Sequence, residues 1–478
     1  MRPLELALLA ADLLTLVLLA LPRLRHTCWP LGAGLLAALL AIVQRIVEGA
    51  RWQMLPADVL TALLLVVAFV FWRRPAGSRT PLRRVATGLV LALAALLFAV
   101  AALLPAALPM FRFPAPSGPY AVGTLTYHWV DRSRADFGAP NAPRELMAQI
   151  WYPAVPTPGA EHDTYIQDDM HFGPLPGTPF PAIFSSHLNQ VRTNALKAAP
   201  AAAGGPFPVL VFSPGAEGFR QHNTFEVESL VSHGYAVIGI DHPRAAREVV
   251  FPDGRCVEFD PQLVDVPRFL RDEAFGERIY NYLAGDVSFV LDRMTALDAA
   301  DPNGILTGRL DVGRAGMLGV SLGGLVGAEA CRTDPRLKAC LTEDVFVPRD
   351  VIAAGLAQPA MWLASDAASM AREGWPQWEV DLHQQTMRAA YEAARADAYF
   401  VHVPGMFHLN FTDFPYTLAT PIARALHLIG PIDWRRGHDI VDAYALAFFD
   451  RHLKAKDAPL LAGPSPAFAE VSLESRHP

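Results

Sequence analysis

The sequence is poor in cysteine and lacks the common cofactor-binding motifs. Only four of its 478 residues are cysteines, and their spacing fits neither a metal-binding cluster nor a disulfide framework. No phosphate-binding loop or dinucleotide-binding fingerprint is present, and beyond residue 112 no basic stripe with interleaved aromatic side chains occurs. We therefore expect no metal, no cofactor and no nucleic-acid partner.

Acidic residues and lysine are nearly missing from the first quarter of the chain. Residues 1–112 contain eleven arginines, no lysine and four acidic residues, a net charge of +7, whereas the remainder carries a net charge of −14. The hydrophobic residues are also concentrated in this first part. A basic, apolar head on an acidic body predicts a membrane module joined to a soluble domain.

The head contains four apolar segments, at 4–21, 30–43, 55–72 and 85–108. Most approach the ~20 residues that a helix needs to cross a bilayer, and the second is short unless it extends through Val47. Tryptophans near segment ends, at Trp29, Trp52 and Trp72, are typical of the membrane interface. Five arginines between residues 73 and 84 predict a cytoplasmic third connection, which leaves the soluble domain outside the cytoplasm. We predict a multi-pass protein of a bacterial-type inner (plasma) membrane, with the bilayer as a partner and an undefined oligomeric state.

The soluble part is organised around the motif Gly319-Val320-Ser321-Leu322-Gly323. An apolar, strand-like run precedes it and a small-residue, helix-compatible run follows, which is the context of a nucleophile elbow. The two glycines remove Cβ atoms where strand and helix crowd, so that the Ser321 hydroxyl can project from a strained turn. The backbone N–H of Leu322 then points at a developing oxyanion. A glycine-rich structural turn is the alternative.

Strand-like and helical stretches alternate around this motif, which predicts an α/β fold with a mostly parallel sheet flanked by helices. The turn after the strand at 208–213 offers the Ala216 N–H as a second oxyanion donor. His408 follows the last core strand, at 398–403, and is the candidate base. Asp344 and Asp366 follow the two preceding strands, so that either can be the acid, with Glu343 a further alternative.

Several stretches resemble the platelet-activating-factor acetylhydrolases of the plasma and type II intracellular kind, a phospholipase A family. The resemblance spans residues 118–415 and is carried by 120–123, 150–153, 211–220, 319–324, 334–344 and 408–414. It implies the α/β-hydrolase fold, no metal or cofactor, and cleavage of short or oxidised acyl chains from phospholipids. Position by position, it implies a nucleophile, an acid, a base and two oxyanion donors at Ser321, Asp344, His408, Ala216 and Leu322.

Together these inferences predict a membrane-anchored serine esterase acting on a lipid or small-molecule ester. We expect a four-helix transmembrane module over 1–110, a proline-rich linker over 111–119, a hydrolase domain over 120–460 and a flexible tail over 461–478. Residues 153–206 are expected to form a surface insertion with a helix near 193–199. The alternatives are a broad-specificity polyester or xenobiotic carboxylesterase, similar to dienelactone hydrolases or cutinases, and a catalytically silent membrane receptor module.

Overall fold

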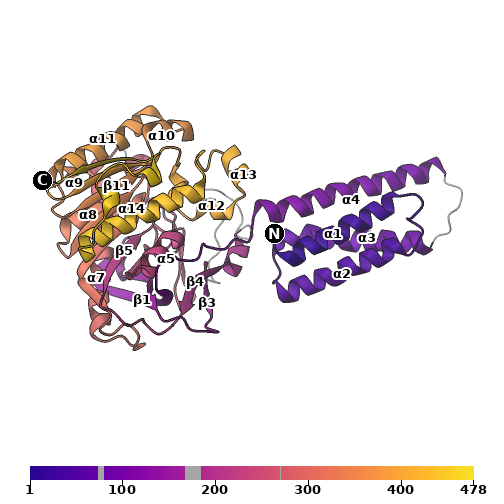
Figure 1. The fold of residues 1–478 in the computed structure, drawn as a ribbon, viewed down its shortest axis with the longest axis horizontal. Coiled ribbons are helices and arrows are strands. Elements are labelled where there is room, and N and C mark those ends of the chain that lie inside the picture. The colour runs from indigo at the N-terminus through magenta and orange to yellow at the C-terminus, as the bar shows by residue number, and fades with distance from the viewer. Residues whose placement is uncertain (74–79, 167–184, 270, 478) are drawn as a thin grey trace. The chain divides into compact units, whose positions relative to one another are not determined.

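A computed structural model describes residues 1–73, 80–166, 185–269 and 271–477 (Figure 1). Contacts within the chain divide it into two units. The first consists of residues 1–111 together with residues 185–191 and 416–422 among those described, and the second contains the rest of the chain.

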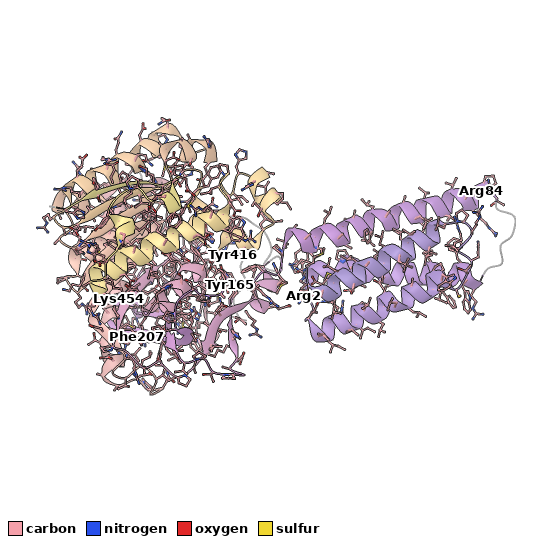
Figure 2. All side chains as sticks on the ribbon, viewed as in Figure 1. Arg2, Arg84, Tyr165, Phe207, Tyr416 and Lys454 are labelled. Atoms are coloured by element: carbon pink, nitrogen blue, oxygen red, sulfur yellow. The ribbon has the colours of Figure 1, made fainter. Side chains whose placement is uncertain are left out.

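The first unit is a bundle of helices α1 (Pro3–Ala20), α2 (Trp29–Val47), α3 (Leu55–Arg73) and α4 (Pro81–Ala107). Each is long and apolar enough to cross a membrane, and each overlaps one of the predicted segments. Arg2 and Arg84 mark the two ends of the bundle (Figure 2). Many large apolar side chains on its outside remain exposed, among them Leu36, Leu39 and Leu93. An apolar outer surface between charged ends is typical of a transmembrane bundle.

The interior of this bundle holds acidic groups whose partners the sequence does not reveal. Arg51 donates to both carboxylate oxygens of Glu5 at 2.7 Å, and both side chains are fully buried. The Thr61 hydroxyl of α3 lies 2.9 Å from both carboxylate oxygens of Asp12 in α1. An unpaired polar group in hydrocarbon is costly. These contacts therefore fix α1 against α3 and against the connection that leads into α3.

The second unit is built on one large sheet, in which eleven of the described strands have the order β13-β12-β11-β10-β9-β5-β6-β2-β1-β4-β3. Its parallel centre comprises β6 (Ala236–Asp241), β5 (Phe207–Ser213), β9 (Leu310–Val320), β10 (Leu337–Glu343), β11 (Ala360–Ala364) and β12 (Ala398–His402). β2 (Ala139–Ala154) and β1 (Ala121–Asp136) form a hairpin beside β6, followed by β4 (Arg192–Lys197) and β3 (His162–Thr164). A separate small hairpin pairs β7 (Glu248–Val250) with β8 (Cys256–Glu258).

Helices cover both faces of the sheet. They are α5 (Thr224–Ser232), α6 (Val266–Phe269), α7 (Glu273–Ala299), α8 (Leu322–Thr333), α9 (Arg349–Ala354), α10 (Ala367–Glu373), α11 (Gln377–Ala393), α12 (Phe414–Thr417), α13 (Thr420–Ala425) and α14 (Trp434–Lys454). The side chains of β9 show which helix lies on which face. A Cβ on Gly316 would lie about 3.0 Å from side chains of α14, whereas the neighbouring Met317 packs on Gly327 of α8. Successive residues of a strand point to opposite faces, so that α14 and α8 lie on opposite sides. α5 packs with α14, and α7 with α8.

The structure contradicts two local predictions. The expected helix near 193–199 is the strand β4, because this stretch pairs in parallel with β1 and antiparallel with β3 and tertiary pairing overrides local preference. Much of the surrounding insertion, residues 167–184, lies outside the described residues. The tail over 461–478, expected to be flexible, contains β13 (Ser472–Arg476), which pairs antiparallel with β12. This strand is too short for its pattern to be visible without the edge it covers.

Candidate active site

Ser321 occupies the sharp turn between β9 and α8. Its φ of 55° and ψ of −126° are unusual for a residue with a side chain, and such strain persists only where the surroundings enforce it. β9 is held on both sides, by β5 and β10, and the Ser321 N–H donates to the Glu343 carbonyl at 2.9 Å. The predicted strand–turn–helix context is confirmed.

The glycines of the motif are required by close backbone approaches. A Cβ on Gly323 would lie 1.9 Å from the Ser213 carbonyl oxygen, and one on Gly319 would lie 2.2 Å from the Gly323 carbonyl oxygen. Both distances are far below contact distance, and the atoms approached belong to the backbone of strand and helix. The turn therefore depends on glycine at both positions.

We expect Gly323→Ala to lower the free energy of unfolding by about 3 kcal/mol or more, or to prevent folding, because backbone atoms cannot move aside cheaply. Gly327→Ala, one turn further along α8, is the matched control. The three atoms nearest to its Cβ all belong to the flexible Met317 side chain, the closest 2.9 Å away, and alanine favours the helix. Urea unfolding monitored by circular dichroism measures both. Equal stability of the two variants would contradict the steric argument.

His408 and Asp344 meet at the carboxyl ends of the parallel strands β12 and β10, which lie on either side of β11. The His408 Nδ1 lies 2.7 Å from Asp344 Oδ2, and the other carboxylate oxygen accepts the Ser365 N–H at 2.8 Å. Burial opposes ionisation of both side chains. The hydrogen bond and charge between them outweigh it, so that the pKa of His408 is raised and that of Asp344 is lowered. The pair can hold an imidazolium that forms during a reaction.

His408, Asp344 and Ser321 line the same cavity, which has a volume of about 310 Å³. The Ala216 turn and Leu322, the first residue of α8, also line it. The first N–H groups of a helix have no partner within the helix and can bind an anion. A Cβ on Gly215 would lie 3.2 Å from the Ser321 Cβ, which shows how closely the Ala216 turn approaches the serine. The structure thus brings five predicted site residues together.

The two other acid candidates lie elsewhere. Asp366 caps α10, where its carboxylate accepts the Ser369 N–H at 2.9 Å. The Glu343 side chain is buried beside Glu226 of α5, on the sheet face that α5 and α14 cover. Burial and the neighbouring Glu226 charge raise the pKa of Glu343. Of the three carboxyl groups, only Asp344 has a hydrogen bond to His408 among the described contacts.

Several residues near the catalytic candidates were not identified from the sequence. His222 and His383 line the cavity, and burial is the main cause that lowers the pKa of each to about 4. Trp375 contacts the edges of both His408 and His383, at ring-centroid distances of 5.7 and 4.7 Å. The Glu373 carboxylate accepts the backbone N–H of His408 at 2.9 Å, and burial raises the pKa of Glu373 to about 7. Their spacing in the sequence carries no motif, because three of them come from the α10–α11 region, which folds over the site.

A family model for "Platelet-activating factor acetylhydrolase, isoform II" matches residues 107–253 and 293–459, which is more than half of the chain. The chain belongs to this family. The match begins at residue 107, so that the family model does not include the helices α1–α3 or most of α4.

Individual relatives agree with the family and the fold. A probable 1-alkyl-2-acetylglycerophosphocholine esterase from Arthroderma benhamiae is 27% identical over 76% of this chain and 93% of its own length. A platelet-activating factor acetylhydrolase from Gallus gallus is 20% identical over 72% and 85%, respectively. The structure of a ferulic acid esterase from Streptomyces cinnamoneus matches 76% of this chain and 99% of its own with a TM-score of 0.63 and 31% identity. As a member of the acetylhydrolase family, the protein is therefore an ester hydrolase, and it has the α/β-hydrolase fold. Both predictions are confirmed.

Proposed function

We propose that the protein is a membrane-anchored serine esterase that removes short or oxidised acyl chains from phospholipids, with Ser321, His408 and Asp344 as its triad. The observation that carries this proposal is the 2.7 Å contact between His408 and Asp344 in the cavity that also contains Ser321 on its strained turn. These three side chains have the roles and the surroundings that acyl transfer by a serine hydrolase requires.

In the proposed reaction the Ser321 Oγ attacks the ester carbonyl carbon while the His408 Nε2 takes its proton. The N–H groups of Ala216 and Leu322 stabilise the oxyanion that forms on the carbonyl oxygen. The C–O bond to the alcohol then breaks, and the alcohol leaves with the proton from His408. Water, deprotonated by His408, then attacks the acyl carbon. The bond from that carbon to the Ser321 Oγ breaks, and His408 returns the proton to Oγ as the acid leaves. Asp344 keeps the proton on Nδ1 and stabilises the imidazolium.

The four apolar helices support anchoring in a bilayer, with the arginine distribution favouring a hydrolase domain outside the cytoplasm. A lipid ester suits an enzyme held at this surface. The lining of the Ser321 cavity supports an apolar acyl group, because among its described residues Phe346, Trp375, Leu325 and Val345 provide apolar walls and no lysine or arginine contributes.

A second candidate function, a broad-specificity carboxylesterase, is favoured by the similarity to a ferulic acid esterase. The third prediction, a catalytically silent receptor, finds no support in the family to which the chain belongs.

An acyl-chain profile separates the two enzymatic functions. We expect the full-length protein in detergent to hydrolyse acetyl and other short acyl phospholipids, with kcat/KM falling at least tenfold from short to palmitoyl chains, because a cavity of about 310 Å³ cannot enclose a long chain. Titration of the released acid measures the rate. Turnover of aryl esters and polyesters with no phospholipid cleavage would instead establish the broad carboxylesterase.

A further inference from the structure

The structure contains a second Ser-His-Asp arrangement, next to the turn that carries Ala216. The Ser213 Oγ lies 2.9 Å from the His242 Nε2, and the His242 Nδ1 lies 2.8 Å from Asp286 Oδ2. We call these three residues the buried triad, because all three side chains are buried. Ser213 and His242 are not among the described residues that line the Ser321 cavity. Ser213 therefore cannot attack an ester in that cavity, and the buried triad has another role.

Asp286 of α7 is the fixed end of the buried triad. Arg144 of β2 donates to both of its carboxylate oxygens, at 3.2 and 2.7 Å, and Arg134 of β1 donates to one of them at 2.7 Å. Burial opposes ionisation of Asp286, but the Arg144 charge and these hydrogen bonds outweigh it and hold its pKa well below the usual range. A carboxylate only accepts hydrogen bonds, so that the His242 Nδ1 is the donor and its Nε2 faces the Ser213 hydroxyl.

The loop at 242–247, which follows β6, also holds the Ala216 turn through other contacts. The Glu217 N–H donates to the Ala245 carbonyl at 2.9 Å, and the Glu217 and Arg247 side chains form an ion pair. Glu217 has a φ of 56°, which is unfavourable for a residue with a side chain and persists only where the surroundings enforce it. The turn therefore depends on this loop for its conformation.

Ser213 joins the Ala216 turn to the elbow. A Cβ on Gly323 would lie 1.9 Å from the Ser213 carbonyl oxygen, so that this part of the backbone lies against the first turn of α8. Of the two proposed oxyanion donors, the Leu322 N–H belongs to α8 and the Ala216 N–H to the turn. The position of Ser213 thus sets the spacing between them. Oxyanion donors act because they are held in place beforehand, and a displacement of ~1 Å can cost a factor of about 10² in rate.

We propose that the buried triad positions the Ala216 N–H for the oxyanion, by fixing the Ser213 hydroxyl through His242 to the ion-paired Asp286. None of the three residues touches the substrate. The inference rests on the proposed function, because it requires Ser321 as the nucleophile and the Ala216 N–H as a donor. It adds the residues that hold this donor in place.

The test measures kcat/KM on p-nitrophenyl acetate for the full-length enzyme in detergent, per active site counted by complete fluorophosphonate labelling. The second readout is Ki for a trifluoromethyl ketone, whose adduct with Ser321 carries an oxyanion. Ser213→Ala removes the hydroxyl, and the side chain in His242→Asn reaches Asp286 but is too short to reach Ser213. We expect each variant to lower kcat/KM about 10–100-fold and to raise Ki by the same factor.

His242→Gln is the conservative variant. Its amide extends one bond further than that of asparagine and reaches the position of Nε2, so that it keeps the hydrogen bond to Ser213 and should restore kcat/KM to within about threefold of the wild type. Ser232→Ala is the matched control, because the buried Ser232 hydroxyl also has two hydrogen bonds, at 2.7 and 3.0 Å, but lies at the end of α5. It should keep the wild-type kcat/KM and Ki.

These readouts separate positioning from stability, because a merely structural role would lower the unfolding midpoint and leave kcat/KM per labelled site unchanged. Wild-type kcat/KM and Ki in Ser213→Ala and His242→Asn would overturn the positioning role, whatever their stability. If one of the two variants does not fold, the other decides. A wild-type enzyme that hydrolyses the ester but is not labelled at Ser321 would overturn the proposed function as well.

Discussion

Replacing Ser321 by alanine is expected to reduce kcat on every ester substrate by about 10⁵–10⁶-fold and to abolish labelling by a fluorophosphonate probe. The hydroxyl is the group that forms the acyl-enzyme, and the turn between β9 and α8 offers no substitute for it. The N–H groups of Ala216 and Leu322 would remain, so that a small residual rate from oxyanion stabilisation is expected. Turnover of p-nitrophenyl acetate and in-gel fluorescence measure the two effects.

Ser475→Ala is a suitable control, because Ser475 is exposed on the edge strand β13. It should retain the wild-type rate and label fully. Folding of both variants is checked by thermal unfolding, in which removal of one hydroxyl at the active-site turn should change the midpoint little. A folded Ser321→Ala protein that keeps more than a hundredth of the wild-type rate would show that another nucleophile performs the reaction.

The parts of the fold that depend on local pattern could be predicted from the sequence. β5, β6, β11, β12 and the second halves of β9 and β10 are short, mostly apolar runs that are buried on both faces, and such runs bounded by turns are typical of parallel strands. Around Ser321 the sequence was equally informative, because the glycines that allow the turn stand at fixed positions beside it. The strands β5 and β9 to β12 and the turn were therefore predicted correctly.

The acid could not be chosen from the pattern, for a physical reason. Asp344 and Asp366 both follow parallel strands, whose carboxyl ends meet at the same edge of the sheet. Which of the two reaches His408 depends on the path of the loops, and the structure gives that contact to Asp344. The family resemblance had implied the same residue.

Contacts between segments that lie far apart in the chain also could not be predicted from the sequence. β4 and β13 exist because neighbouring strands pair with them, and no periodicity within either segment indicates this. The buried pair of Arg51 and Glu5 joins residues 46 positions apart. Glu373 and His383 reach the site from α10 and α11, and no spacing in the sequence marks them as functional residues. Local pattern thus predicts elements, whereas their partners follow only from the folded chain.

Asp344→Asn is expected to lower kcat about 10⁴-fold, whereas Asp366→Asn should change it less than threefold. An amide at position 344 cannot stabilise the imidazolium and favours the wrong tautomer of His408. Asparagine at position 366 caps α10 about as well as aspartate does, so that Asp366→Asn should also leave the protein as stable as the wild type. Initial rates on p-nitrophenyl acetate measure both variants.

The pH dependence gives an independent test of the same contact. His408 acts as a base only when it is neutral, so that kcat/KM falls as the pH drops through its pKa. Burial lowers that pKa, but the hydrogen bond and charge of Asp344 raise it above the ordinary value near 6.5. In Asp344→Asn only the effect of burial and of more distant charges remains, and the acidic limb of the residual activity should move to lower pH. An unmoved limb, or a collapse of activity in Asp366→Asn instead, would assign the acid to Asp366.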